Sequence, residues 1–124
     1  MDNSIQSAAI EMAREHRRTL ADILYRYRHK DSYYLLFYTY QDPMEDEHII
    51  RTKAFLLTHP PRPPQMGTIL YHVDNKKGKC VKIGVWLKDN VAPDWLLDER
   101  ENNIKDIIAS VQDFNLPIEV MQMH

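Results

Sequence analysis

The sequence is poor in the residues that many recognisable sites require. It contains one cysteine, Cys80, and three glycines among 124 residues. A single thiol cannot close an internal disulfide or build a multi-thiolate zinc site, and without a disulfide framework we expect a cytoplasmic protein. No GxxxxGKS or GxxxxGKT phosphate-binding motif and no GxSxG nucleophile motif is present. These absences exclude the best-marked nucleotide-binding and hydrolase classes.

Long apolar runs are also missing. No uninterrupted apolar segment approaches the roughly 20 residues that a membrane-spanning helix needs. The sequence begins Met-Asp-Asn-Ser, which is not a basic stretch followed by an apolar run, so we expect no secretory signal. The sequence therefore predicts a protein without membrane association.

The overall composition is typical of one globular domain. Hydrophobic residues make up 44% and charged residues 27% of the chain, which argues against a disordered or fibrous protein. The formal net charge is -2, which argues against a protein that works mainly by non-specific attraction to polyanions. We expect a single domain over residues 1–124 with one hydrophobic core.

Two segments have the periodicity of amphipathic helices. Residues 3–29 carry apolar side chains at three- and four-residue steps, followed by cations in the last turn. Residues 99–113 show the same pattern after a capping box of Asp98 and Glu101. The apolar stripe of this second segment is Ile104, Ile107, Ile108, Val111 and Phe114.

Four segments between the helices predict strands. They are residues 32–40, 48–58, 67–74 and 80–88. The second also has residues typical of a helix start, but its β-branched side chains favour a strand. The last two form a hairpin whose turn contains Gly78, a residue that can adopt a left-handed conformation. Four prolines within residues 60–64 predict a stiff connector, and residues 118–121 predict a short final strand.

The order of elements predicts the α+β class. It reads α-β-β-β-β-α-β, and the hairpin connections favour a mainly antiparallel sheet of four or five strands. The long N-terminal helix and the second, C-terminal helix are expected on one face of that sheet. In residues 80–88, strict alternation predicts that one set of side chains faces the helices. That set is Val81, Ile83, Val85 and Leu87.

The face away from the helices is then predicted to carry aromatic rings. Such a patch is seldom left bare on a monomer, so we expect it to bind another protein or a second copy in a homodimer. Size and composition are like those of small accessory, inhibitor and immunity-type proteins of mobile elements, without a motif match. The expected contact residues are Trp86, Tyr34, Tyr38, Lys82 and Lys88.

An alternative function follows from the uneven charge distribution. Residues 14–30 have a net charge of +4 and residues 76–88 of +5, whereas residues 89–124 have -6. Cations bind phosphates and the interleaved tyrosines could stack on bases, which is typical of a nucleic-acid-binding module. The residues assigned to this alternative are Arg17, Arg18, Arg26, Arg28, Lys30, Lys76, Lys77 and Lys79.

A catalytic function is the third hypothesis and has the weakest support. His72 and Asp74 lie two apart in a predicted strand and thus on one side, as a hydrolase-type pair could. Glu45 and His48 have a spacing that can bring two metal ligands together on a helix. Helical carboxylate–histidine metal sites need two such motifs, so we expect no metal and no cofactor.

Overall fold

The computed structural model describes residues 3–40, 43–46, 51–62, 65–87 and 102–111. The order of elements is α1, β1, β2, β3, β4, β5 and α2, which confirms the predicted α+β class. Their bounds are α1 Asn3–Arg26, β1 Ser32–Tyr40, β2 Arg51–Leu57, β3 Thr68–Asp74, β4 Lys79–Trp86, β5 Asn102–Asn103 and α2 Ile104–Ser110.

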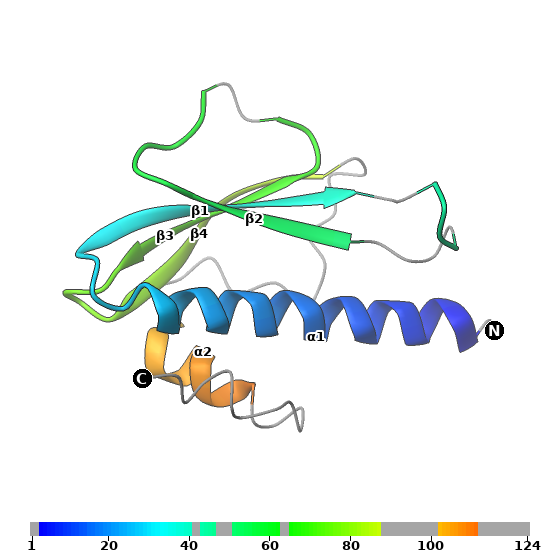
Figure 1. Cartoon of the computed structure of the whole chain (residues 1–124), viewed down its shortest axis with the longest axis horizontal. Coiled ribbons are helices and arrows are strands. Elements are labelled where there is room, and N and C mark those ends of the chain that lie inside the picture. The colour runs from blue at the N-terminus through cyan, green and yellow to red at the C-terminus, as the bar shows by residue number, and fades with distance from the viewer. Residues whose placement is uncertain (1–2, 41–42, 47–50, 63–64, 88–101, 112–124) are drawn as a thin grey trace.

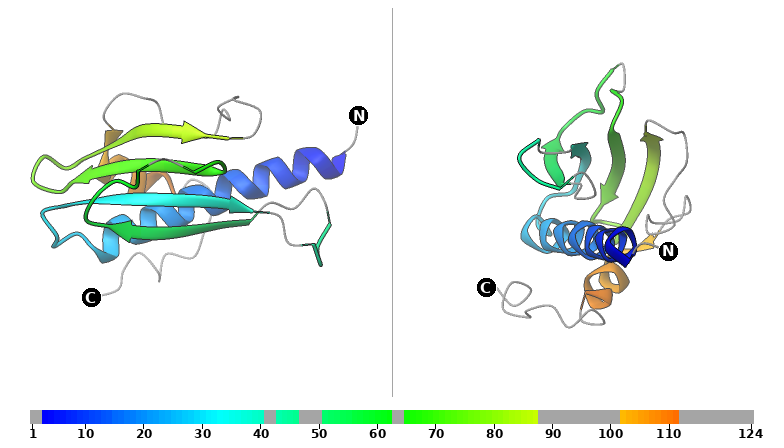
Figure 2. Two further views of the ribbon diagram at one scale, coloured as in Figure 1. Left: turned by 90° about the horizontal axis from the view of Figure 1, so that it is seen from above. Right: turned by 90° about the vertical axis from the view of Figure 1, so that its right-hand side faces the viewer.

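The strands form one antiparallel sheet with the order β2-β1-β3-β4-β5. β1 is an interior strand that pairs with β2 and β3, and the ambiguous segment before the prolines is the strand β2. α1 lies along one face of the sheet, and α2 packs beneath α1 (Figures 1 and 2). The helices therefore cover one side of the sheet, as the sequence predicted.

The core lies between α1 and the sheet because both elements turn apolar side chains toward each other. Leu20 and Leu24 of α1 are fully buried, in agreement with the predicted stripe. On β1, alternate residues Tyr33, Leu35 and Phe37 are buried against the helix, while the intervening side chains are only half-buried. The period of two in a strand thus sorts this uniformly apolar segment into a core side and an outer side.

The outer side of the sheet, here called the far face, carries Tyr34, Leu36 and Tyr38 of β1. β2 and β3 both run antiparallel to β1 on either side of it, so their connection must travel the length of the sheet. This crossover segment, residues 58–62 and 65–67, passes over the far face (Figure 1). Leu70 pairs with Leu36 on that face and is only 3% exposed. The chain therefore covers part of the face that the sequence predicted to be bare.

A β-bulge in β4 changes which of its side chains face α1. Neighbouring residues of β3 pair with Lys82 and Gly84, so Ile83 is an extra residue in the ladder. Cys80, before the bulge, is fully buried in the core, and Val85, after it, packs against the same core. Of the four residues predicted to face the helices, Val85 and Leu87 do pack against the core. Val81 instead pairs with His72 on the far face, and the bulged Ile83 is 47% exposed. The predicted alternation is therefore wrong only up to the bulge, which reverses it.

The second helix begins later than its periodicity predicted. Asn103 is its N-cap, since the side-chain oxygen accepts a hydrogen bond from the backbone nitrogen of Lys105 at 2.9 Å. Asn102–Asn103 form β5 on the start of β4, which holds the beginning of α2 beside the β3–β4 turn. Ile104 and Ile107 are buried, as the predicted stripe requires.

Some predicted features fall on residues that the structure does not describe. They are the capping box of Asp98 and Glu101, the C-terminal part of the second helix, and the strand at residues 118–121. α1 ends at Arg26 rather than at residue 29. Within the described ranges, no helix combines the length and the apolar character that crossing a membrane requires.

Candidate nucleic-acid interface

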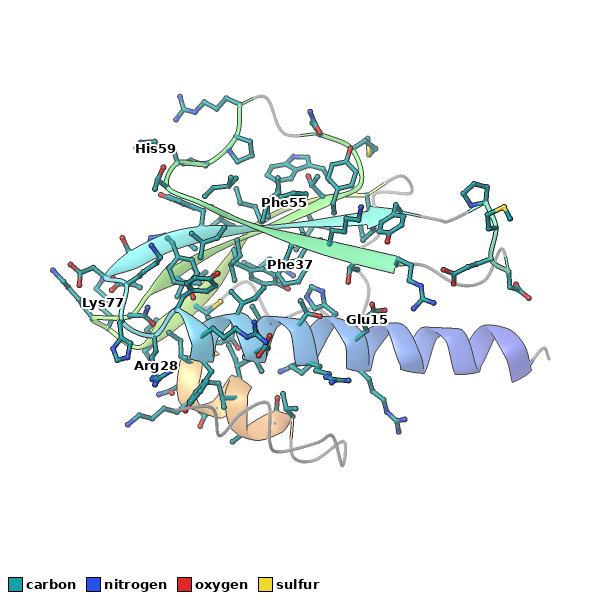
Figure 3. All side chains as sticks on the ribbon, in the orientation of Figure 1. Glu15, Arg28, Phe37, Phe55, His59 and Lys77 are labelled. Atoms are coloured by element: carbon teal, nitrogen blue, oxygen red, sulfur yellow. The ribbon has the colours of Figure 1, made fainter. Side chains whose placement is uncertain are left out.

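Two turns that are distant in the sequence are joined at one end of the molecule by Asn75. Its side-chain nitrogen donates hydrogen bonds to the carbonyl oxygens of Tyr27 at 3.0 Å and Lys30 at 2.5 Å. Its backbone nitrogen donates to the carbonyl oxygen of Asp31 at 2.9 Å. The turn after α1 and the β3–β4 turn therefore form one surface, on which Arg28 and Lys77 lie at the same end of the molecule (Figure 3).

The β3–β4 turn is built so that its lysines point outward. The carboxylate of Asp74 accepts hydrogen bonds from the backbone nitrogens of Lys76 at 3.0 Å and Lys77 at 3.2 Å. Gly78 closes the turn at φ +67°, a conformation that side chains disfavour. The backbone nitrogens of Lys76 and Lys77 are thus satisfied within the turn, and both lysines are exposed.

The resulting surface, here called the basic end, combines cations from both turns. It comprises Arg26, Arg28, Lys30, Lys76, Lys77 and Lys79. Arg26 pairs with Asp22 at 3.0 Å, and Lys76 pairs with Asp31 at 3.6 Å. Both pairs are exposed and such pairs are weak, so they reduce the positive potential only in part.

Two planar groups lie among these cations. Tyr27 is 40% exposed and packs edge-on against buried Tyr33, with the ring centroids 6.2 Å apart. The guanidinium of Arg28 lies 4.2 Å from the centre of the Tyr25 ring and also donates to the carbonyl oxygen of Tyr25 at 2.8 Å. An exposed ring and a stacked guanidinium are the groups on which nucleic-acid bases stack.

Of the cations assigned from the sequence to a nucleic-acid site, the structure brings together those of the basic end. Arg17 and Arg18 lie further back along α1. Arg17 donates to the hydroxyl of Ser110 on α2 at 3.4 Å, and Arg18 is exposed. The described residues include 14 Lys or Arg and eight Asp or Glu, so the acidic excess of the whole chain comes from the other residues.

The predicted aromatic contact residues are half-buried rather than bare. Tyr34 packs against the His72 ring at 4.8 Å, and the Tyr38 hydroxyl donates to Gln65 of the crossover segment at 3.4 Å. The Trp86 indole lies directly over Gly84. These three rings share the far face, as predicted.

The two lysines predicted beside those rings are not placed with them. Lys82 pairs with Tyr71, a core residue, and therefore lies on the α1 side of the sheet. Lys88 lies outside the described residues. The most exposed ring on the far face is instead Phe55, at 48%. Phe55 was not predicted as a contact residue. The side of the sheet on which its ring lies follows only from its pairing with Leu36 of β1, which the sequence does not show.

The His72–Asp74 pair occupies one face of β3, as the spacing predicted. Asp74, however, directs its carboxylate to the turn, and His72 packs on Tyr34. His48 of the predicted metal pair lies outside the described residues. Across the part of the chain that the structure describes, no group of three or more His, Cys, Asp or Glu side chains could hold a metal ion.

The buried ionisable side chains of the core favour their neutral forms. Burial, and to a smaller extent the charge of Arg17, lowers the pKa of His16 to about 3. Burial raises the pKa of the Cys80 thiol to about 12 and also raises that of Tyr33. A thiol that stays protonated is a poor nucleophile, so Cys80 is a core residue.

Among the residues that the structure describes, the basic end and the far face are the candidate binding surfaces. Comparisons with protein-family models, with curated proteins and with solved structures gave no match to this chain. Function must therefore be inferred from the chemistry of these two surfaces.

Proposed function

We propose that this protein is a non-catalytic binding protein that contacts nucleic acid through its basic end. The observation that carries the proposal is the pair of hydrogen bonds from Asn75 to the carbonyl oxygens of Tyr27 and Lys30. They hold two basic segments together that the sequence separates widely. Cations fixed at neighbouring positions bind a phosphate backbone at a smaller entropic cost than cations on separate mobile loops. A cytoplasmic location fits this function.

The number of free cations sets the expected dependence of binding on salt. Arg26 forms an ion pair with Asp22, and Lys76 forms one with Asp31. The remaining four, Arg28, Lys30, Lys77 and Lys79, form no ion pair with a carboxylate of the described residues, so their charge can be neutralised by phosphates. Each neutralised phosphate releases counterions and contributes about -0.7 to -0.9 to the slope of log K against log salt. We therefore expect a slope of about -3.

Fluorescence anisotropy with a labelled oligonucleotide tests this proposal. We expect binding at about 50 mM salt that weakens by roughly two orders of magnitude at about 200 mM salt. Heparin should compete with the oligonucleotide, because it offers the same anionic chemistry. No binding at low salt, or an affinity that does not change with salt, would exclude the basic end as a nucleic-acid site.

The second candidate function is binding of a protein, including a second copy of this chain in a homodimer, through the far face. The 48% exposure of Phe55 favours it, because a large apolar side chain beside half-buried Tyr34 and Tyr38 can anchor a protein contact. Light scattering after size exclusion tests the homodimer, and Phe55→Ser should then weaken it. A strict monomer at high protein concentration would overturn the self-association proposal.

A further inference from the structure

We infer that the nucleic acid bound at the basic end is single-stranded, with one base stacked on Tyr27 and the next on Arg28. This inference rests on the proposed function and adds to it the form of the ligand. Phosphate contacts alone do not distinguish a single strand from a duplex, because both present the same backbone charge. The planar side chains of Tyr27 and Arg28 at the basic end distinguish a single strand from a duplex.

Tyr27 has the properties of a stacking platform. It lies between Arg26 and Arg28 in the turn after α1, and the residue is 40% exposed. The ring packs edge-on, at 67° between the planes, against Tyr33, which is 1% exposed and cannot move aside. The orientation of Tyr27 is therefore set before any ligand arrives, which reduces the entropic cost of stacking a base on it.

Arg28 supplies a second platform next to the first. Its guanidinium lies over the Tyr25 ring at 4.2 Å and is held there by its hydrogen bond to the Tyr25 carbonyl oxygen. The Tyr25 ring thus lies on one side of the guanidinium, and Arg28 is exposed to solvent. Arginine planes stack on nucleic-acid bases as aromatic rings do. The outer face of Arg28 can therefore receive a base.

The lysines complete the site because they surround the two platforms with charge. Lys30 and Lys77 are exposed, and the Asn75 amide fixes the β3–β4 turn to the backbone of Lys30. In a duplex, the base faces are already stacked inside the helix and are out of reach of Tyr27. In a single strand the bases can turn toward the protein while phosphates meet the lysines. Only a single strand can therefore contact both the stacking groups, Tyr27 and Arg28, and the lysines.

The experiment compares ligands and variants by fluorescence anisotropy. The ligands are labelled oligo(dT), oligo(U) and a duplex of the same length, and circular dichroism checks that each variant is folded. Tyr27→Leu should weaken binding of both single strands by about 5- to 100-fold, because stacking on one ring is lost, and should leave the salt slope unchanged. Tyr27→Phe keeps the ring and should keep the affinity.

Tyr40→Leu is the matched control. Tyr40 is 37% exposed and also lies beside a cation, with the Lys53 nitrogen 5.2 Å from its ring centre, but it is on β1 and far from the two joined turns. Its replacement should leave the affinity within about twofold, since it removes no base contact. Duplex binding should be weaker than single-strand binding and should respond to neither substitution.

The outcomes separate this inference from the function on which it rests. A duplex that binds as tightly as the single strands, or a Tyr27→Leu variant with full affinity, overturns the inference. The salt-dependent affinity of the unaltered protein would then still support nucleic-acid binding at the basic end. Equal affinity for oligo(dT) and oligo(U) supports base stacking without a contact to the sugar. Tighter binding of oligo(U) supports base stacking with an added contact to the 2′-hydroxyl.

Discussion

Asn75 donates a hydrogen bond from its side-chain amide to the backbone carbonyl oxygen of Lys30, and the two atoms are 2.5 Å apart. The contact joins the turn after α1 to the turn between β3 and β4. Ser32 pairs with Asp74 where β1 meets β3, so the two turns extend from neighbouring strand ends. Sheet pairing brings the turns near each other, and Asn75 fixes their distance.

Replacing Asn75 with Ala should loosen this connection. We expect the free energy of unfolding to fall by about 1–2 kcal/mol, because two partly exposed hydrogen bonds are lost. Oligonucleotide affinity should fall by about 3- to 10-fold, because the two basic segments lose their fixed spacing. Gln65→Ala, which removes a distant amide that contacts Tyr38, is the control. Equal affinities of Asn75→Ala and the unaltered protein would show that the connection plays no part in binding.

A charge reversal at Lys77 should weaken binding more than the same reversal elsewhere. Lys77→Glu places an anion at the exposed tip of the basic end. We expect the affinity for the oligonucleotide to fall about tenfold or more, and the slope of log K against log salt to become shallower by about one. Lys53→Glu makes the same change in net charge on β2, opposite Tyr38. That variant should lose much less affinity. Equal losses would mean that net charge alone controls binding.

The stability of the fold should decrease in acid because of His16. Its imidazole Nε2 lies 2.7 Å from the Tyr71 hydroxyl oxygen in the core, and burial lowers its pKa from 6.5 to about 3. The unfolded chain therefore takes up a proton at a higher pH than the folded chain. His16 contributes its full stability above about pH 6.5 and loses about 1.4 kcal/mol per pH unit as the pH falls from there toward 3.

Urea unfolding between pH 7 and pH 4 measures this dependence. His16→Phe should be less stable than the unaltered protein at pH 7, because the buried contact with the Tyr71 hydroxyl is lost, and its stability should vary less with pH. His29→Gln changes an exposed histidine and serves as the control. An unchanged pH dependence in the His16 variant would contradict the assignment of this effect to His16.

The cover over the far face predicts different costs for two apolar substitutions on that face. Leu70 is 3% exposed, so Leu70→Ala should lower the free energy of unfolding by about 2–5 kcal/mol. Phe55 is 48% exposed, so Phe55→Ala should cost about 1 kcal/mol or less. Urea denaturation of both variants measures the difference. Similar small losses in the two variants would indicate that the far face is bare, as expected from the sequence alone.

Local patterns in the sequence were sufficient to locate most elements. The aromatic run in β1 could only suit a pleated strand, and the strand predicted at residues 32–40 has the bounds observed. The positive φ of Gly78 follows from the need for a tight turn between two apolar runs. Each of these features depends on residues that are close together in the chain, and that is why they could be predicted.

Features that depend on strand order could not be predicted in the same way. Nothing in the residues of β2 and β3 states that β1 lies between them, and the crossover over Leu70 follows only from that order. The bulge at Ile83 gives no signal in the sequence either, because apolar residues alternate through it as in a regular strand. Asn75 is an ordinary turn residue in the sequence, and only the pairing of β1 with β3 brings it to Lys30.

The most direct test of the proposed interface is to map where an oligonucleotide binds. Backbone amide chemical shifts of the isotope-labelled protein can be recorded by NMR during titration with oligo(dT) at low salt. We predict the largest changes in the turn after α1, at Tyr27, Arg28 and Lys30, and in the β3–β4 turn, at Lys76 and Lys77. Changes concentrated on β2 and the crossover segment, or none at all, would contradict nucleic-acid binding by the basic end.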